Sequence, residues 1–152
     1  MHAYILKESD SELRVAASPE STKKMVEMGL SVSVQTTAGD KSNFSDESYA
    51  ASGAEIFENT TEIANADIVI KVNKPTNEEI SSMKDGALFI GSLDPYNSNE
   101  TISNLKEKGV TSFAMELMPR ITRAQSMDIL SSQSNLAGYK AVIDATHLFN
   151  KA

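Results

Sequence analysis

The stretch SPESTKKMVEMGLSVSVQT, residues 18–36, decides the fold, because a complete helix signal in it runs straight into a strand signal. Ser18 suits a helix N-cap, Pro19 suits the first turn, and Gly29 suits the C-terminal stop. The apolar run Ser31–Thr36 follows at once and predicts a strand. We expect three apolar side chains on the inner side of this helix, namely Met25, Val26 and Met28.

Similar helix start and stop signals recur along the rest of the chain. Four further helices are predicted, one from Ser45 to Gly53, one behind the capping box Thr76-x-x-Glu79, one from Asn97 or Ser98 to Gly109, and a long terminal one from about Ser131 to Phe149. Short runs rich in Val, Ile, Leu or Phe predict the other strands, at Ala3–Leu6, Asp67–Val72, Ala87–Ile90 and Val110–Ala114. Such alternation is typical of an α/β fold, with a mostly parallel sheet and helices on both faces.

The predicted sheet resembles Rossmann-like and flavodoxin-like folds, but the chain lacks a dinucleotide fingerprint. It has seven glycines, and no two of them are spaced as G-x-G. A fingerprint of that kind lets the backbone approach a pyrophosphate at a helix N-terminus. We therefore assign no nucleotide of its own to this sheet.

Length and composition limit the classes of function. The chain has 152 residues, 40% of them hydrophobic, which is enough for one good core, so residues 1–152 are predicted to form a single domain. A net charge of -7 argues against nucleic-acid binding, which needs clustered Lys and Arg. The absence of cysteine excludes disulfides and thiolate sites. Because no run of about 18 apolar residues occurs, we expect a cytoplasmic chain that reaches a membrane only through a partner.

A polar segment between the last predicted strand and the terminal helix, residues 116–133, is the main candidate site. In a parallel α/β sheet, the segment that leaves the carboxyl end of a strand is where ligands are contacted. Arg120, Gln125, Asp128 and Ser131 offer a fixed cation, an amide, a carboxylate and a hydroxyl, a set that can grip a carboxamide and a ribose. An alternative stays open, in which these residues are loop polars and helix caps, with Asp128 or Ser131 binding backbone N–H groups.

Other polar residues are weaker candidates. Arg14 has the chemistry to bind a carboxylate bidentately, although we favour pairing with a nearby acid. Asp94 suits a turn former more than a catalyst. The run Lys71–Lys74 predicts a solvated strand end. His2 and His147 are isolated, so we expect no metal site.

Taken together, these segments resemble the N-terminal domain shared by alanine dehydrogenases and the alpha subunits of NAD(P) transhydrogenases. The resemblance covers nearly the whole chain. Its motifs are Lys7-Glu8, Arg14-Val15-Ala16-x-x-Pro19-Glu20, Gly39-Asp40, Phe44-Ser45-Asp46-x-x-Tyr49-x-x-x-Gly53-Ala54-Glu55, Ala66-Asp67-Ile68-Val69 and Leu93-Asp94-Pro95-Tyr96-Asn97. Two further segments, Met118–Asp128 and Ser131–Ala141, resemble the transhydrogenase branch in particular.

The resemblance also separates the two branches. Alanine dehydrogenases pair the arginine with a lysine in a Lys-Val-x-x-Pro segment and a histidine after the next strand, which hold and protonate pyruvate. This sequence has Asn73 and Asp94 at those points. Alanine dehydrogenase therefore becomes the alternative, and Arg14 is expected to be structural.

In the transhydrogenase family, the residues that match Arg120, Gln125, Asp128 and Ser131 face the nicotinamide and ribose of NAD(H). The resemblance implies that they position NAD(H) for hydride transfer with NADP(H), which binds a partner component. It implies as partners an NAD-binding Rossmann domain, the NADP-binding and membrane components of a proton-translocating transhydrogenase, and a second copy in a homodimer. That Rossmann domain is expected to be absent from these 152 residues, so the isolated chain is expected to be inactive and without a bound cofactor. A non-catalytic α/β interaction module remains a further alternative.

Overall fold

The computed structural model describes residues 1–58 and 60–149. Its contacts divide the chain into two compact units, Met1–Ala114 and Met115–Ala152. The first unit contains the sheet with its helices. The second contains the polar segment and the terminal helix.

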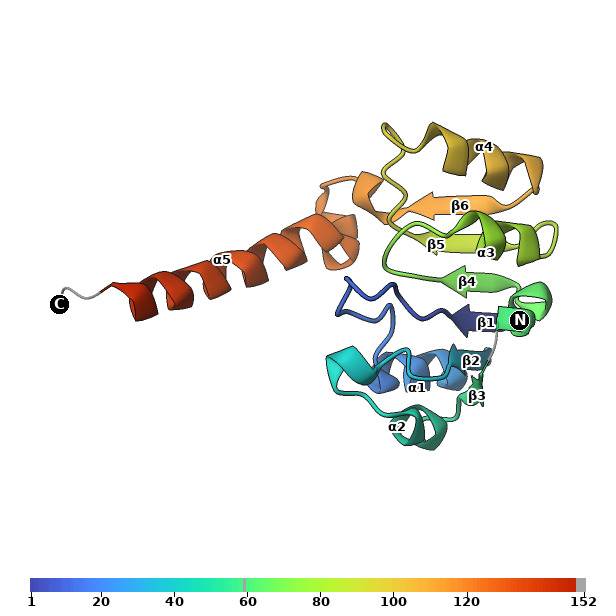
Figure 1. The fold of residues 1–152 in the computed structure, drawn as a ribbon, viewed down its shortest axis with the longest axis horizontal. Helices are drawn as coiled ribbons and strands as arrows, with labels where there is room; N and C mark the ends of the chain where they lie inside the picture. Colours follow the sequence, from blue (N-terminus) through green and yellow to red (C-terminus); the bar gives the residue numbers. More distant parts are fainter. Residues whose placement is uncertain (59, 150–152) are drawn as a thin grey trace. The chain divides into compact units, whose positions relative to one another are not determined.

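The strands of the first unit pair in parallel, in the order β3-β2-β1-β4-β5-β6 (Figure 1). In this order β1 and β4 lie in the centre of the sheet. The strand order reverses direction between them, as in doubly wound dinucleotide-binding sheets. The predicted parallel sheet is confirmed. The strands are β1 (His2–Ile5), β2 (Ser31–Gln35), β3 (Glu55–Phe57), β4 (Ile68–Ile70), β5 (Leu88–Gly91) and β6 (Thr111–Ala114).

Helices cover both faces of this sheet, as the sequence predicts. Side chains alternate between the faces along β1, so Tyr4 and Leu6 join one buried cluster and Ile5 joins the other. The Ile5 cluster takes side chains from α1 and α2, and the Tyr4 cluster takes them from α3 and α4. The helices are α1 (Pro19–Glu27), α2 (Asp46–Ala51), α3 (Asn77–Ser82) and α4 (Asn99–Glu107), with the 3-10 helices η1 (Asp40–Ser42) and η2 (Thr60–Asn65).

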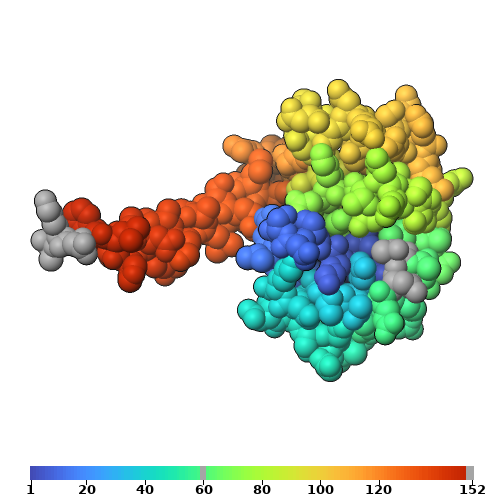
Figure 2. All heavy atoms as spheres, in the orientation of Figure 1, coloured from blue at the N-terminus to red at the C-terminus, as the bar shows by residue number. Residues whose placement is uncertain are grey.

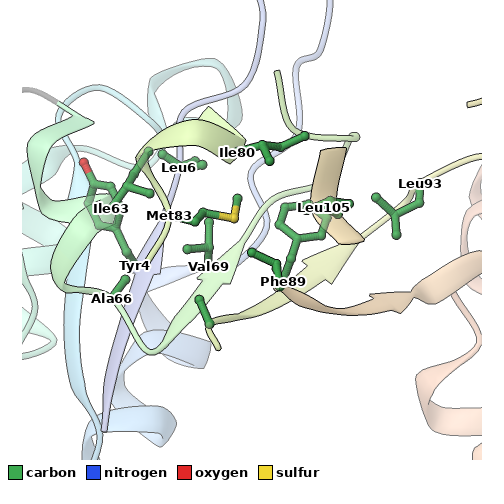
Figure 3. Close-up of a cluster of buried hydrophobic side chains, with 12 residues drawn as sticks. Tyr4, Leu6, Ile63, Ala66, Val69, Ile80, Met83, Phe89, Leu93 and Leu105 are labelled. Carbon is green, nitrogen blue, oxygen red and sulfur yellow. The ribbon is translucent and has the colours of Figure 1, made fainter. Parts of the chain in front are cut away.

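The cluster beneath α3 and α4 holds the β4, β5 and β6 half of the sheet from one side. Figure 3 shows Val69 of β4 and Phe89 of β5 meeting Met83, at the end of α3, and Leu105 of α4. Each of these side chains is at most 2% exposed. Burying a side chain of this size stabilises the fold by about 1.5–3 kcal/mol.

The helix signals around α1 are confirmed, but the predicted position of one side chain is not. The Ser18 side chain accepts the N–H of Ser21 at 3.2 Å, and Gly29 takes a φ of 90° that stops the helix. Met28 is 72% exposed, so the prediction that it lies on the inner side is wrong. Thr22, three residues before Met25, is fully buried instead. Met28 is the C-cap, one residue past the end of α1 at Glu27, and the chain turns out of the helix at Gly29.

One strand of the sheet was not predicted. The edge strand β3, Glu55–Phe57, has only three residues and begins with an exposed charge, so it is too short to show a period of two. The predicted strand Asp67–Val72 is also longer than the observed β4. Asp67 precedes β4, and its carboxylate accepts the N–H of His2 at 2.7 Å and pairs with Lys84.

The second unit consists of two 3-10 turns and one long helix. They are η3 (Met115–Leu117), η4 (Thr122–Met127) and α5 (Ile129–Leu148), which confirms the predicted terminal helix. α5 exposes large apolar side chains along its length, among them Leu136 and Tyr139, and its atoms are drawn in orange and red in Figure 2. No helix in the described ranges has both the length and the apolar character needed to cross a membrane. The placement of Arg120–Ser131 at the carboxyl edge of the sheet stays a prediction.

Candidate functional site

The polar segment that follows β6 in the chain folds around a hollow of about 280 Å³. All four residues predicted for the site line it, so the structure brings them together within the second unit. Its lining residues are Arg120, Ile121, Thr122, Gln125, Asp128 and Ser131.

The local fold explains why these residues meet. The N–H of Ala124 donates to the carbonyl of Ile121 at 2.9 Å, and the N–H of Asp128 donates to the carbonyl of Gln125 at 3.3 Å. In a 3-10 helix, residues three apart lie above one another. Thr122, Gln125 and Asp128 therefore fall on one side of η4. Ala124, 4% exposed, fixes its other side.

Asp128 ends η4 and caps α5. Its Oδ1 accepts the N–H groups of Leu130 at 3.0 Å and Ser131 at 3.1 Å. Its Oδ2 accepts the hydroxyl of Ser131 at 2.6 Å. The Asp128 residue is only 7% exposed. The cap alternative is thus correct for Asp128, whose carboxylate fixes Ser131 and the first turn of α5 at the wall of the hollow.

The electrostatics of the site keep Asp128 ionised. The hydrogen bonds from the Ser131 hydroxyl and N–H, the bond from the Leu130 N–H and the charge of Arg120 lower the pKa of the Asp128 carboxyl below its ordinary value. Burial opposes this shift without reversing it. The hollow therefore holds a fixed negative charge near a fixed positive one.

The remaining polar groups of the hollow are open to a ligand. Arg120, Thr122, Gln125 and Ser131 are exposed. Within residues 1–58 and 60–149, neither the Arg120 guanidinium nor the Gln125 side-chain amide forms a hydrogen bond. The site can thus offer a ligand the Arg120 cation, the Gln125 amide and the Thr122 hydroxyl, whereas the Ser131 hydroxyl donates to Asp128 and has only its acceptor side left.

The size of the hollow limits that ligand. Pockets that enclose a drug-sized molecule have volumes of roughly 300–1,000 Å³. A hollow of about 280 Å³ is at the lower limit of that range. It has room for a small polar group rather than for a larger ligand.

Sequence reasoning passed over two lining residues, Ile121 and Thr122. A signal for Thr122 was present, because Thr122, Gln125, Asp128 and Ser131 follow one another at intervals of three. That interval matches the repeat of a 3-10 helix. Ile121 has no comparable signal, since it enters the hollow as the residue before η4.

The other candidates lie in the first unit and have structural partners. Arg14 binds Glu12 bidentately, with Nε to Oε1 at 2.8 Å and the terminal nitrogen to Oε2 at 2.7 Å. The hydrogen bonds that the Arg14 side chain donates lower the pKa of the Glu12 carboxyl to about 2. Asp94 has a φ of 47° and accepts the side-chain amide of Asn97 at 2.9 Å, as a turn former does. The ring of His2 bonds the Ser33 hydroxyl at 2.8 Å.

The prediction of a solvated strand end at Lys71–Lys74 is wrong for Lys71. The Lys71 side chain is 6% exposed, and its Nζ donates to both carboxylate oxygens of Glu79, at 2.8 and 2.9 Å. Glu79 also accepts the backbone N–H of Thr76 in the capping box. An ammonium group can be buried when it is paired and hydrogen-bonded in this way.

Comparisons with known proteins agree with the resemblance seen in the sequence. The first part of the NAD(P) transhydrogenase alpha subunit of Rhodospirillum rubrum is 44% identical over 147 residues, which cover 93% of this chain and 38% of that protein. The chain in the crystal structure of transhydrogenase from Sinorhizobium meliloti is 48% identical, with a TM-score of 0.94. The match covers 100% of this chain and 46% of that one. Alanine dehydrogenase of Bacillus subtilis is less similar, at 32% identity over 132 residues, or 87% of this chain and 34% of that protein.

The chain thus spans less than half the length of these relatives. The family model described as "Alanine dehydrogenase/PNT, N-terminal domain" matches residues 4–137. The transhydrogenase relatives are the more similar ones, in agreement with the branch expected from Asn73 and Asp94. This chain belongs to the family of alanine dehydrogenase/PNT N-terminal domains.

Proposed function

We propose that this chain is a portion of the NAD(H)-binding component of a proton-translocating NAD(P) transhydrogenase. The observation that carries the proposal is the convergence of Arg120, Gln125, Asp128 and Ser131 on one hollow. Its donors and acceptors suit the carboxamide and ribose of NAD(H). The transhydrogenase relatives, similar over nearly the whole chain, support the same choice.

In this proposal the hollow positions the nicotinamide for hydride transfer with NADP(H) on a partner component. NAD(H), when bound, supplies or accepts the hydride. The chain's own residues orient it: Gln125 and Ser131 offer hydrogen bonds, and Arg120 offers a fixed cation. Asp128 acts through Ser131, because its carboxylate fixes the Ser131 hydroxyl and the start of α5. Positioning is the contribution of these residues.

The amino-acid dehydrogenase alternative has less support. Its substrate would need a cation such as Arg14 for its carboxylate, and Glu12 already binds the Arg14 guanidinium bidentately. The neighbouring Asn73 supplies no cation, and its side-chain amide donates to Glu8 at 3.2 Å and Glu12 at 3.3 Å. This edge of the sheet therefore has internal partners for its polar groups.

The test measures single-turnover hydride transfer and NADH affinity in the complete protein. Asp128→Asn, Gln125→Asn and Arg120→Ala should slow transfer far more than they weaken NADH binding. Asparagine at position 128 keeps an acceptor for the backbone N–H groups of Leu130 and Ser131, but its NH2 group replaces the Oδ2 atom that accepts the Ser131 hydroxyl. A misplacement of about 1 Å can lower the rate on the order of a hundredfold when the reacting atoms must lie roughly 3–3.5 Å apart. Arg123→Ala is the matched control, because Arg123 is exposed on the same 3-10 helix and does not line the hollow. Unchanged transfer in all three variants would leave these residues as caps and turn formers.

The 152-residue chain alone should bind NADH weakly or not at all. Its hollow has room for one end of a dinucleotide, and no G-x-G pair marks a place for the pyrophosphate. Calorimetric titration of the chain with NADH measures this directly. A dissociation constant in the low micromolar range would contradict the prediction and would place a complete site within these residues.

A further inference from the structure

Thr122 lines the hollow, and its hydroxyl is available to a ligand. It begins η4, directly after the extended residue Ile121, and it is exposed. Within residues 1–58 and 60–149, no other group forms a hydrogen bond with the Thr122 hydroxyl. A hydroxyl has one O–H donor and two acceptor sites. Thr122 can therefore both donate to a ligand and accept from it.

The hydroxyl of Ser131, which also lines the hollow, differs from that of Thr122. Its proton is directed at Asp128, whose Oδ2 accepts the Ser131 hydroxyl at 2.6 Å. Towards a ligand, the Ser131 oxygen can only accept. Of the two hydroxyl groups in the described lining, the one on Thr122 is thus the one that can still donate.

Donors and acceptors are separated along the segment that forms the hollow. Arg120, which can only donate, and Thr122 lie on either side of Ile121 in the chain. We call these two side chains the donor end. The oxygens of Asp128 and Ser131 form the acceptor end. A 3-10 helix rises about 2 Å per residue, so roughly 12 Å of backbone separates Thr122 from Asp128.

We propose that the Thr122 hydroxyl donates a hydrogen bond to the carbonyl oxygen of the nicotinamide carboxamide and so helps to orient the ring for hydride transfer. The inference rests on the proposed function, which supplies the cofactor. A carbonyl oxygen has two lone pairs, so it can accept from the Arg120 guanidinium and the Thr122 hydroxyl together. The ribose is attached to a different atom of the ring, and its hydroxyls can donate to the acceptor end.

The opposite polarity of this hydrogen bond has less support. If the Thr122 oxygen accepted from the carboxamide, the ligand would turn its NH2 group toward the donor end. The Arg120 guanidinium there has five N–H donors and no acceptor, so it would face another donor. Gln125 does not decide the orientation, because its side-chain amide can both donate and accept.

Three variants of the complete protein test the role of the hydroxyl. Thr122→Val replaces it by a methyl group, Thr122→Ser keeps it, and far-UV circular dichroism checks that each variant folds. Ser126→Ala is the matched control, because Ser126 is exposed on the same 3-10 helix and does not line the hollow. Single-turnover hydride transfer from NADPH to NAD+ should be about 3- to 10-fold slower in Thr122→Val, as expected for the loss of one hydrogen bond. Transfer in Thr122→Ser and Ser126→Ala, and the affinity of Thr122→Val for NAD+, should stay within about twofold of wild type.

Two analogues of NAD+ show which atom of the carboxamide Thr122 contacts. The 3-acetylpyridine analogue keeps the carbonyl oxygen and has no amide N–H, whereas the thionicotinamide analogue keeps the NH2 group and has sulfur, a weak acceptor, in place of the oxygen. With the acetylpyridine analogue, Thr122→Val should again be about 3- to 10-fold slower than wild type. With the thionicotinamide analogue, the difference should fall to about twofold or less.

The opposite pattern with the two analogues would overturn the proposal, because Thr122 would then contact the amide nitrogen. Equal transfer rates to NAD+ in Thr122→Val and wild type would also overturn it. If Arg120→Ala and Asp128→Asn are slow while Thr122→Val is not, only the inference about Thr122 fails. If transfer is normal in all of these variants, the proposed function fails with it.

Discussion

Replacement of Glu8 by alanine should lower the free energy of unfolding of the first unit by about 2 kcal/mol. Glu8 lies just beyond β1 and is 7% exposed. Its Oε1 accepts the N–H of Val72 at 2.6 Å, and its Oε2 accepts the side-chain amide of Asn73 at 3.2 Å, so it ties the segments that leave the two central strands. Hydrogen bonds to a charged group contribute about 1.5–3 kcal/mol each. Desolvation of the carboxylate offsets part of that gain, which leaves a net effect of about 2 kcal/mol.

The variant Glu8→Gln separates hydrogen bonding from charge. Burial, opposed by the Val72 and Asn73 hydrogen bonds and by Lys71, raises the pKa of Glu8 above its ordinary value of 4.5. The folded state therefore holds this proton more tightly than the unfolded state. The proton-linked part of the Glu8 contribution to stability is fully present below pH 4.5 and is lost as pH rises through the folded pKa, which leaves the hydrogen bonds of the carboxylate. Glutamine keeps an acceptor for the N–H of Val72 and has no charge, so Glu8→Gln should lower the free energy of unfolding by about 1 kcal/mol or less. The difference in stability between this variant and the wild type should shrink as pH rises.

Urea unfolding followed by far-UV circular dichroism measures both effects, at about pH 5 and about pH 8. With a slope of about 1–3 kcal/mol per molar urea, a loss of 2 kcal/mol moves the midpoint by roughly 1 M. An alanine variant with the wild-type midpoint would refute the reasoning, because Glu8 would then contribute nothing net. A glutamine deficit that grows with pH would refute the sign of the pKa argument.

Two further predictions concern the remaining carboxylates. Asp128→Ala should speed amide hydrogen exchange at Leu130 and Ser131 by about 2- to 30-fold, as expected for the loss of a helix cap. Exchange in Asp128→Asn should stay within about twofold of wild type, because asparagine is an equally good cap. Unchanged exchange in the alanine variant would show that Asp128 does not cap α5. In an NMR titration, the Glu12 carboxyl should show a pKa of about 2, so its bond to Arg14 stabilises the fold above pH 4.5 and is lost as pH falls through 2. Arg14→Lys cannot form the bidentate pair and should raise the pKa of Glu12 by about one unit or more. An unchanged pKa would contradict the role given to Arg14.

The features that could be predicted from sequence are those decided within a few residues. The caps at Ser18 and Thr76 and the stop at Gly29 each depend on neighbours no more than four positions away, and all three are confirmed. Parallel pairing followed from the order of elements. The burial of Lys71 could not be predicted, because it requires the Glu79 carboxylate, already fixed by the capping box, to turn toward the end of β4.

The candidate site was predictable for a similar reason. Its residues lie within one segment of twelve, at positions 120–131, and a 3-10 turn brings every third one to the same side. The sequence left open whether Asp128 binds a ligand or caps a helix. The structure selects the cap, because its oxygens accept the N–H groups of Leu130 and Ser131 and the Ser131 hydroxyl.

The position of β1 in the sheet has a consequence for synthesis of the protein. β1 precedes the other five strands in the sequence and lies between β2 and β4, so this central strand is made before the strands that pair with it. Ala3 pairs with Ile68, and at about 5–20 residues per second the ribosome needs roughly 3–13 s to make the intervening chain. During those seconds Tyr4, Ile5 and Leu6 form an apolar strand with an open edge, a hazard for aggregation. Newly made copies of this chain should therefore depend on a chaperone that shields β1 until β4 has emerged.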